Sequence, residues 1–304
     1  MRPVTTYYGI TGPVPFLDVD VDDDNRLFVD PFKIRMGHGP TTFANSAVAC
    51  MSSFFDEITR TVVSGNGTDH ARGLDLLQHF EEPRETRLGM SKHGTDGHGG
   101  SDGVGQDIWD TLRGDAAVLV RIGVLHQIED LALFVPGIDK DITSDVTTRA
   151  IFGPLIDFTN DCVANFPALA GGTGVKQFTR QVWDPVALKW EQRKISLPTV
   201  DDKPLVLIPA EWATRNLLLN ATRLYETELL GWVQLQRATR NSKGKLVKTS
   251  KERLREDPRL SRGNETILKT VEDAYGKGTN IVANFKRWAQ ERYEAKIQAQ
   301  GDVA

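Results

Sequence analysis

The chain has 304 residues, of which 39% are hydrophobic and 26% are charged, and its formal net charge is -4 with an isoelectric point near 5.9. These values are ordinary for a water-soluble globular protein, and they give no overall positive charge for binding DNA or an anionic membrane. Residues 1–15 lack the features of a secretion signal, and no apolar run is long enough to span a membrane. We therefore expect a cytoplasmic protein without a membrane segment.

The first quarter of the chain predicts two short strands followed by two helices. Apolar and acidic side chains alternate over 16–21, and a second apolar run over 26–30 stops at a proline, so the two predict a hairpin. Apolar residues then recur at helical spacing over 41–64. A further helix is predicted over 70–80.

The middle of the chain predicts a long helix, a buried strand and another long helix. The first helix covers 104–127, and the apolar run 131–135, which stops at Pro136, reads as a buried strand. Thr143 or Ser144 would cap the next helix, which places Asp145 in its first turn and runs to residue 166.

The last third begins with strand-like segments at 182–200 and 203–209, which we expect to pair as a hairpin. A leucine-rich helix follows over 210–240. A polar, lysine-containing linker is predicted over 241–251, and two or three polar helices extend to the end of the chain.

These elements do not alternate regularly as βαβ units, which favours an α+β fold over a doubly wound sheet. We predict a mixed core of helices and short strands over 1–241 and a polar linker with a helical C-terminal extension over 242–304. Cys50 and Cys162 lie in apolar segments without metal-ligand spacing, so both are expected to be buried free thiols.

The segment 88–105 is the strongest local signal of a site, because six of the twelve residues from 94 to 105 are glycine. A glycine-rich loop that leads into a helix leaves backbone N–H groups free to bind an anion. It is neither a P-loop nor a Rossmann fingerprint. We predict a phosphate-binding loop in which His98 could transfer a proton, or else an exposed loop without function; the predicted phosphate-binding residues are Lys92, His93, Gly97, Gly99 and Gly100.

A second candidate site is a group of carboxylates around 129–145. Asp139, Asp141 and Asp145 are the predicted ligands of a divalent metal, Mg²⁺ or Mn²⁺, and Glu129 with Asp145 are predicted catalytic residues. Mg²⁺ prefers one or two carboxylates together with water and phosphate oxygens. The same residues also suit turns and the first turn of a helix, which is the alternative reading.

Other acidic clusters match known sites less well. Glu191 and Lys194 are spaced as Glu-x-x-Lys, so on a strand they point to opposite faces, unlike the acid and lysine of PD-(D/E)xK nucleases. The aspartates over 18–24 lack the glycine and the terminal glutamate of a Ca²⁺ loop. Asp30 stands out because it lies in an apolar setting.

Several phrases resemble an uncharacterised family of bacterial proteins, over most of residues 15–240. They are Arg-Leu-Phe-Val-Asp-Pro at 26–31, Glu-Thr-Arg-Leu-Gly-Met-Ser-Lys at 85–92, Leu-Phe-Val-Pro-Gly-Ile at 133–138 with Ser-Asp-Val-Thr-Thr at 144–148, and Lys-Pro-Leu-Val-Leu-Ile-Pro at 203–209. The resemblance implies a bacterial cytoplasmic setting and an accessory or defence role, and it carries over no catalytic residue.

The leading hypothesis is a divalent-metal-dependent phosphodiesterase or nuclease that acts on a phosphate-containing substrate, with nucleic acid or a nucleotide as a candidate partner, since carboxylates and an anion-binding loop are complementary parts of phosphoryl-transfer sites. It requires the glycine-rich segment and the carboxylates to border one site. One alternative is a non-enzymatic subunit of a larger complex that binds its protein partner through 242–304. Another is a nucleotide-binding module without hydrolysis.

Overall fold

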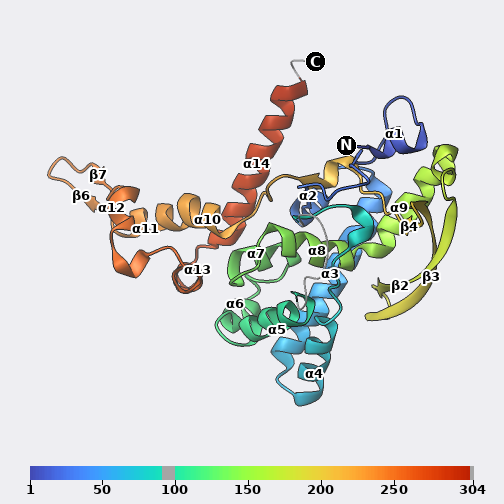
Figure 1. Ribbon diagram of the computed structural model, residues 1–304. Coiled ribbons are helices and arrows are strands. Elements are labelled where there is room, and N and C mark those ends of the chain that lie inside the picture. The colour runs from blue at the N-terminus through green and yellow to red at the C-terminus, as the bar shows by residue number, and fades with distance from the viewer. Residues whose placement is uncertain (91–99, 302–304) are drawn as a thin grey trace.

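A computed structural model describes residues 1–90 and 100–301 of the chain, with the backbone alone at 100–102, 300 and 301 (Figure 1). The predicted α+β class is confirmed, because 55% of the chain is helical and 13% lies in strands of small sheets. Both cysteines are buried free thiols, as expected. Within the described ranges, no helix combines the length and apolarity needed to cross a membrane.

Helix α3 (Thr41–Ser64) is the central helix of the main body, and it has the bounds that its apolar spacing predicts. Its buried face includes Met51, Phe54 and Phe55, which belong to one large hydrophobic core. Helix α4 (Gly67–Leu76) follows directly and covers most of the helix predicted over 70–80.

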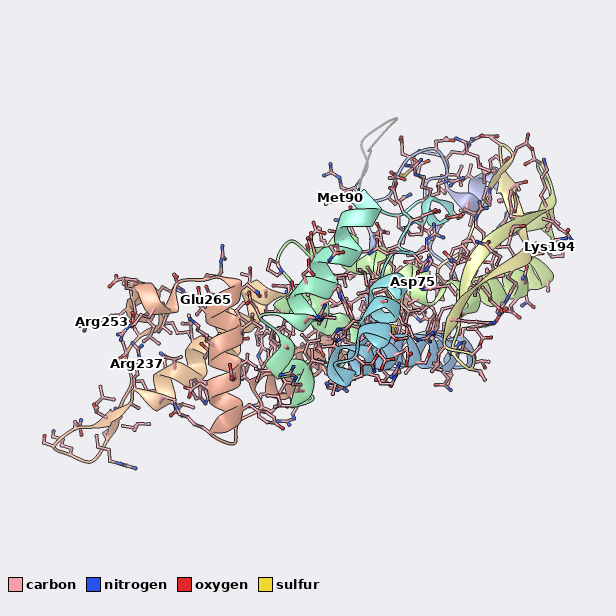
Figure 2. The ribbon with its side chains drawn as sticks, turned by 90° about the horizontal axis from the view of Figure 1, so that it is seen from below. Asp75, Met90, Lys194, Arg237, Arg253 and Glu265 are labelled. Carbon is pink, nitrogen blue, oxygen red and sulfur yellow. The ribbon has the colours of Figure 1, made fainter. Side chains whose placement is uncertain are left out.

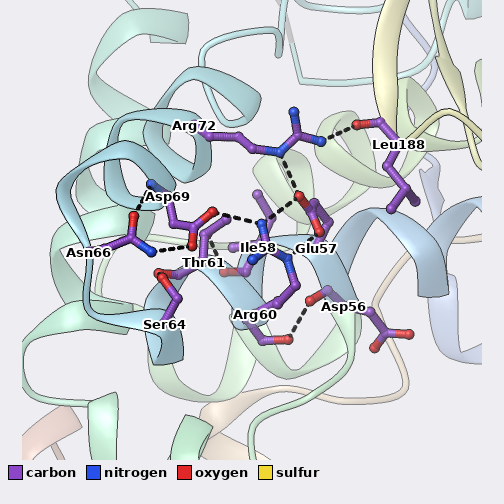
Figure 3. Close-up of polar contacts among 11 residues, drawn as sticks. Asp56, Glu57, Ile58, Arg60, Thr61, Ser64, Asn66, Asp69, Arg72 and Leu188 are labelled. Carbon is purple, nitrogen blue, oxygen red and sulfur yellow. Dashed lines mark hydrogen bonds and ion pairs between the residues drawn. The ribbon is translucent and has the colours of Figure 1, made fainter.

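Charged side chains join α3 and α4 to the hairpin of β2 (Val175–Asp184) and β3 (Lys189–Val200) (Figure 3). Arg60 bonds both Glu57 and Asp69, and Arg72 donates from Nε to Glu57 Oε1. Arg72 also donates to the Leu188 carbonyl oxygen at 2.6 Å, in the turn of the hairpin. These contacts hold the hairpin against the start of the helical core.

The main sheet is an antiparallel hairpin of β2 (Val175–Asp184) and β3 (Lys189–Val200), extended by β4 (Lys203–Pro204). Trp183 opposes Trp190 in the register, and both rings contact Phe54 edge-on. The hairpin turn therefore lies within the predicted strand 182–200. The run 203–209 continues beyond β4 as irregular backbone.

The predicted pairing of 16–21 with 26–30 is wrong. Strand β1 (Phe28–Val29) pairs with β5 (Ala213–Thr214), and Phe16 forms an isolated bridge with Pro209. Asp30 explains this long-range contact, because it accepts from Phe32 N at 3.0 Å and from Leu218 N at 2.8 Å while only 1% exposed. It thereby caps the next helix, α2 (Pro31–Arg35).

Two predictions for the middle of the chain are also corrected. The helix expected over 104–127 is divided into α5 (Gly100–Arg113) and α6 (Ala117–Arg121), with Gly114 in the break. The run predicted as a strand at 131–135 contains the short helix α7 (Leu131–Phe134), which follows a 3₁₀ turn with a capping box. Apolar runs this short do not distinguish a buried helix from a strand.

The helix predicted to continue to residue 166 is two helices, α8 (Lys140–Ala150) and α9 (Phe152–Asn165). Shorter elements complete the main body: α1 (Val4–Tyr8) and 3₁₀ turns at Arg84–Thr86, Pro167–Ala170 and Ala210–Trp212.

The C-terminal part extends to one side of the body (Figure 1). It begins with α10 (Ala221–Leu224), a π-helical turn (Tyr225–Leu229) and α11 (Leu230–Gln236), so the helix predicted over 210–240 is shorter and irregular. The predicted linker forms a hairpin, and the polar helices follow. These elements are β6 (Thr239–Arg240), β7 (Leu246–Val247), α12 (Lys251–Arg255), a 3₁₀ turn (Pro258–Leu260), α13 (Asn264–Gly276) and α14 (Ile281–Gly301).

Candidate functional site

An open cavity of about 890 Å³ lies between α8, the segment 80–87 and the β2–β3–β4 sheet. Acidic and basic side chains line it in equal number. The acidic ones are Glu81, Glu82, Glu85, Asp141 and Asp145, and the basic ones are Arg84, Arg87, Arg149, Arg180 and Lys203. A cavity lined by this many charged side chains suits a polar or charged ligand rather than an apolar one.

Helix α8 begins one turn earlier than its sequence suggests, because Asp139 is its N-cap. The Asp139 carboxylate accepts from Asp141 N at 2.9 Å and from Ile142 N at 3.1 Å. The predicted caps Thr143 and Ser144 lie inside the helix, so Asp141 occupies the first turn and Asp145 does not. Asp139 therefore has a structural role as the cap of the helix, and it does not line the cavity.

Asp141 and Asp145 are four residues apart on α8, so both project from one face of the helix into the cavity. Among the described residues, none donates a hydrogen bond to either carboxylate. Burial, followed by the negative charge of Asp141 and then Glu82, raises the pKa of Asp145 to about 8. Burial and the neighbouring Asp139 also raise the pKa of Asp141. The negative charge of Asp141 thus disfavours ionisation of Asp145, one turn further along the helix.

Glu85 ties the cavity walls together. This residue is only 6% exposed, and its carboxylate accepts from Arg180 Nε at 2.6 Å, while Arg149 Nη2 of α8 lies 3.5 Å from its other oxygen. Arg149 also donates to the carbonyl oxygens of Glu81 and Glu82 at 2.6 and 2.8 Å. This buried network fixes α8, the segment before the glycine-rich region and strand β2 as one rigid wall.

Lys203 and Arg180 each keep hydrogen-bond donors that no described residue uses. Lys203 is exposed at the cavity rim and forms no ion pair with any described residue. Arg180 uses Nε for Glu85 and Nη1 for its neighbour's carbonyl oxygen, which leaves Nη2 without a described partner. Arg87 lies deeper, where burial lowers the pKa of its guanidinium. Lys203 and Arg180 are the groups best placed to meet an anionic ligand.

Most of the predicted phosphate-binding loop lies outside the described residues: Lys92, His93, Gly97, Gly99 and the predicted proton donor His98. Gly100 is described and begins α5. Both described ends of this segment border the cavity. A Cβ placed on Gly89 would lie 3.5 Å from Asp141 Oδ1, and Val104 of α5 lines the cavity itself.

Glu129 is placed away from Asp141 and Asp145. It is 2% exposed, accepts from Arg35 Nε at 2.6 Å and is not part of the cavity lining. The adjacent Asp130 is fully buried, and Lys286 Nζ of α14 lies 2.5 Å from its Oδ1. Both carboxylates have partners that explain their burial, as buried charges require.

The described residues contain no group of three His, Cys, Asp or Glu side chains that could hold a metal ion by themselves. Asp141 and Asp145 provide two carboxylates, which is the number Mg²⁺ commonly takes from a protein when phosphate oxygens and water complete its coordination. An ion held by these two carboxylates would therefore need water or phosphate oxygens as its further ligands.

Residues 11–220 match the family model of a domain of unknown function, DUF8370, as the resemblance to an uncharacterised family implied. No curated protein and no solved structure matches the chain.

Proposed function

The chain belongs to the DUF8370 family, whose function is unknown, and we propose that it is a divalent-metal-dependent phosphodiesterase or nuclease. Asp141 and Asp145 would hold Mg²⁺ or Mn²⁺, and the basic wall would bind the phosphate group of the substrate. A metal in this position supplies Lewis-acid polarisation of a phosphate oxygen.

The observation that carries the proposal is the state of Asp145. A carboxyl in a polar cavity, without a hydrogen-bond donor among the described residues and with a pKa near 8, is unusual for a purely structural residue. A cation between Asp141 and Asp145 would remove the repulsion that disfavours their ionisation. Binding of the cation would then release the proton of Asp145.

The opposite wall supports a phosphate ligand. The contact with Glu85 holds Arg180 in place, so its Nη2 group can meet a phosphate without a further loss of side-chain freedom. Lys203 adds a positive charge at the rim of the cavity. Guanidinium groups match phosphate oxygens in geometry and charge. The glycine-rich segment, whose described ends flank the cavity, would add backbone donors in this proposal.

The first test is a thermal-shift screen of the full chain against Mg²⁺, Mn²⁺ and Ca²⁺, with and without nucleotides. The screen compares wild type with Asp145→Asn and with Asp157→Asn, an exposed aspartate of the neighbouring helix α9. A ligand that binds only the folded state raises its melting temperature. We expect Mn²⁺ or Mg²⁺ to raise the melting temperature of wild type and Asp157→Asn, each relative to its own metal-free value, but not of Asp145→Asn.

The second test is Mn²⁺-dependent hydrolysis of bis(4-nitrophenyl) phosphate and of an oligonucleotide. Hydrolysis by wild type and its loss in Asp145→Asn would support the proposal. In the thermal-shift screen, a metal-induced rise in melting temperature of equal size in all three proteins, or no rise in any of them, would refute the proposal. A shift with nucleotides that is not followed by hydrolysis would assign the cavity to nucleotide binding alone.

A further inference from the structure

The charge of the chain is divided unevenly between its two parts. Residues 1–220 contain 20 basic and 30 acidic side chains, whereas residues 221–304 contain 17 basic and 11 acidic ones. The modest net charge of the whole chain therefore hides a basic C-terminal part. Such asymmetry is typical of chains in which one part meets a polyanion.

The excess of positive charge is most uniform at the β6–β7 hairpin. Residues 237–251 include no acidic residue, and Lys243, Lys245 and Lys248 are exposed. None of the three forms an ion pair with a described residue. In the β2–β3 hairpin, by contrast, Lys176 lies 2.6 Å from Asp202 and Arg193 lies 2.7 Å from Glu191. The three lysines of the β6–β7 hairpin thus form a cluster of positive charge with no acidic partner among the described residues.

The hairpin projects from the end of the molecule opposite the β2–β3 sheet, and therefore opposite the cavity (Figure 1). Arg237 and Arg253 lie at this same end, near the base of the hairpin (Figure 2). Arg237 is neutralised by Asp257 at 2.9 Å, whereas Arg253 is exposed and its guanidinium has no partner among the described residues. Arg253 of α12 thus adds a positive charge at this end of the molecule, although the exposed Glu252 lies next to it in the sequence.

The composition of the hairpin indicates which polyanion it suits. Residues 237–251 contain no aromatic side chain, so the hairpin offers no platform on which bases of a single strand could stack. Leu246 and Val247 are exposed, but they are adjacent on a strand and point to opposite faces, so they do not form the apolar centre of a protein interface. A two-stranded β-ribbon is narrow enough to enter the major groove of a duplex.

We propose that the β6–β7 hairpin, with Arg253, is a binding surface for the phosphate backbone of duplex nucleic acid. Contacts of lysine and arginine with phosphates carry no sequence information, so binding is independent of sequence and steeply dependent on salt. The inference goes beyond the proposed hydrolysis, because this surface lies apart from the cavity and needs neither the metal nor Asp145.

The test measures fluorescence anisotropy of a labelled 24-base-pair DNA duplex, titrated with the full chain at several salt concentrations. The variant is Lys243→Ala with Lys245→Ala and Lys248→Ala. The matched control removes three exposed lysines elsewhere that form no ion pair with a described residue, through Lys189→Ala, Lys194→Ala and Lys296→Ala, and so changes the net charge equally. We expect the affinity of the variant to be lower by roughly tenfold or more at low salt. The negative slope of log K against log salt should become shallower by about 2 to 3. The control should keep the affinity of wild type.

Circular dichroism and a thermal melt accompany each variant, so that a folding defect is separated from a loss of charge contacts. Equal affinities of wild type and the β6–β7 variant would overturn the inference, as would equal weakening in both lysine variants. Tighter binding of the single strand, or of polyglutamate, than of the duplex would overturn it as well. Measured with Asp145→Asn in the background, the assay keeps its meaning even if the cavity has no catalytic role.

Discussion

Arg180 Nε donates a hydrogen bond of 2.6 Å to Glu85 Oε1, and this contact joins strand β2 to the segment that precedes the glycine-rich region. Glu85 also meets Arg149 of α8, so one carboxylate connects three elements around the cavity. Two guanidinium groups thus share one buried carboxylate as their counter-charge. The walls of the cavity therefore depend on Glu85.

Replacing Glu85 by alanine should destabilise the protein by about 3 to 5 kcal/mol, because the change leaves two arginines without their buried counter-charge. Urea unfolding gives the difference directly. Glu191→Ala serves as the control, since the Glu191–Arg193 pair is exposed and such pairs contribute less than about 1 kcal/mol. Equal losses in the two variants would show that the Glu85 network carries no special weight.

Asp145 should make the protein less stable as the pH rises. Its pKa is raised in the folded state to about 8 from an ordinary value near 3.8, so the folded state retains a proton that the unfolded chain has lost. Stability linked to this group is therefore full below about pH 4, declines as the pH rises and is lost above about pH 8. The cost is at most about 6 kcal/mol, since the pKa rises by about 4 and each pKa unit corresponds to about 1.4 kcal/mol.

Asp145→Asn removes this titration, so its thermal stability relative to wild type should grow between pH 5 and pH 8 in metal-free buffer. Asp157→Asn is the control and should follow wild type. A constant difference between Asp145→Asn and wild type over this pH range would contradict the shifted pKa.

Gly105 should not tolerate a side chain. A Cβ at this position would lie 2.1 Å from the Leu77 carbonyl oxygen, so α5 would have to move away from the end of α4. Gly105→Ala is expected to cost about 1 to 3 kcal/mol. Gly103→Ala in the same helix faces open space and should be neutral or stabilising by up to about 1 kcal/mol. A thermal melt in which Gly105→Ala equals Gly103→Ala would refute this close approach.

Lys286 should anchor helix α14 to the main body. Lys286→Ala leaves the fully buried Asp130 carboxylate without its cation, which is expected to cost about 3 to 5 kcal/mol. Lys269→Ala removes an exposed helical pair with Glu265 instead and should cost less than about 0.5 kcal/mol. Chemical denaturation distinguishes the two, and a loss for Lys286→Ala no larger than that for Lys269→Ala would contradict the anchor.

The sequence predicts those elements whose signal is local and long. Helix α3 has the predicted bounds because its apolar spacing persists over many turns. The run 131–135 was too short for periodicity to separate helix from strand, and the capping box of Gln127 and Asp130 decided for the helix. The pairing of β1 with β5 was unpredictable, because it joins segments at opposite ends of the family match through Asp30.

The site was only half accessible to sequence reasoning. The sequence predicts Asp141 and Asp145 as metal ligands because Mg²⁺ prefers carboxylates, and the structure brings both side chains to one cavity. Glu85, Arg149 and Arg180 were missed, because Glu85 meets partners 64 and 95 residues away and no local pattern indicates such pairing. Glu129 was indistinguishable from a ligand until its contact with Arg35 was known.

The claim that Asp141 and Asp145 hold a divalent cation is tested most directly by calorimetric titration of Mn²⁺ into the full chain at pH 6, 7 and 8. Because Asp145 must lose a proton to bind the ion, we predict that the affinity rises by up to about tenfold for each pH unit below its pKa. Asp145→Asn should bind weakly at every pH. An affinity that is independent of pH, or unchanged in Asp145→Asn, would contradict the account.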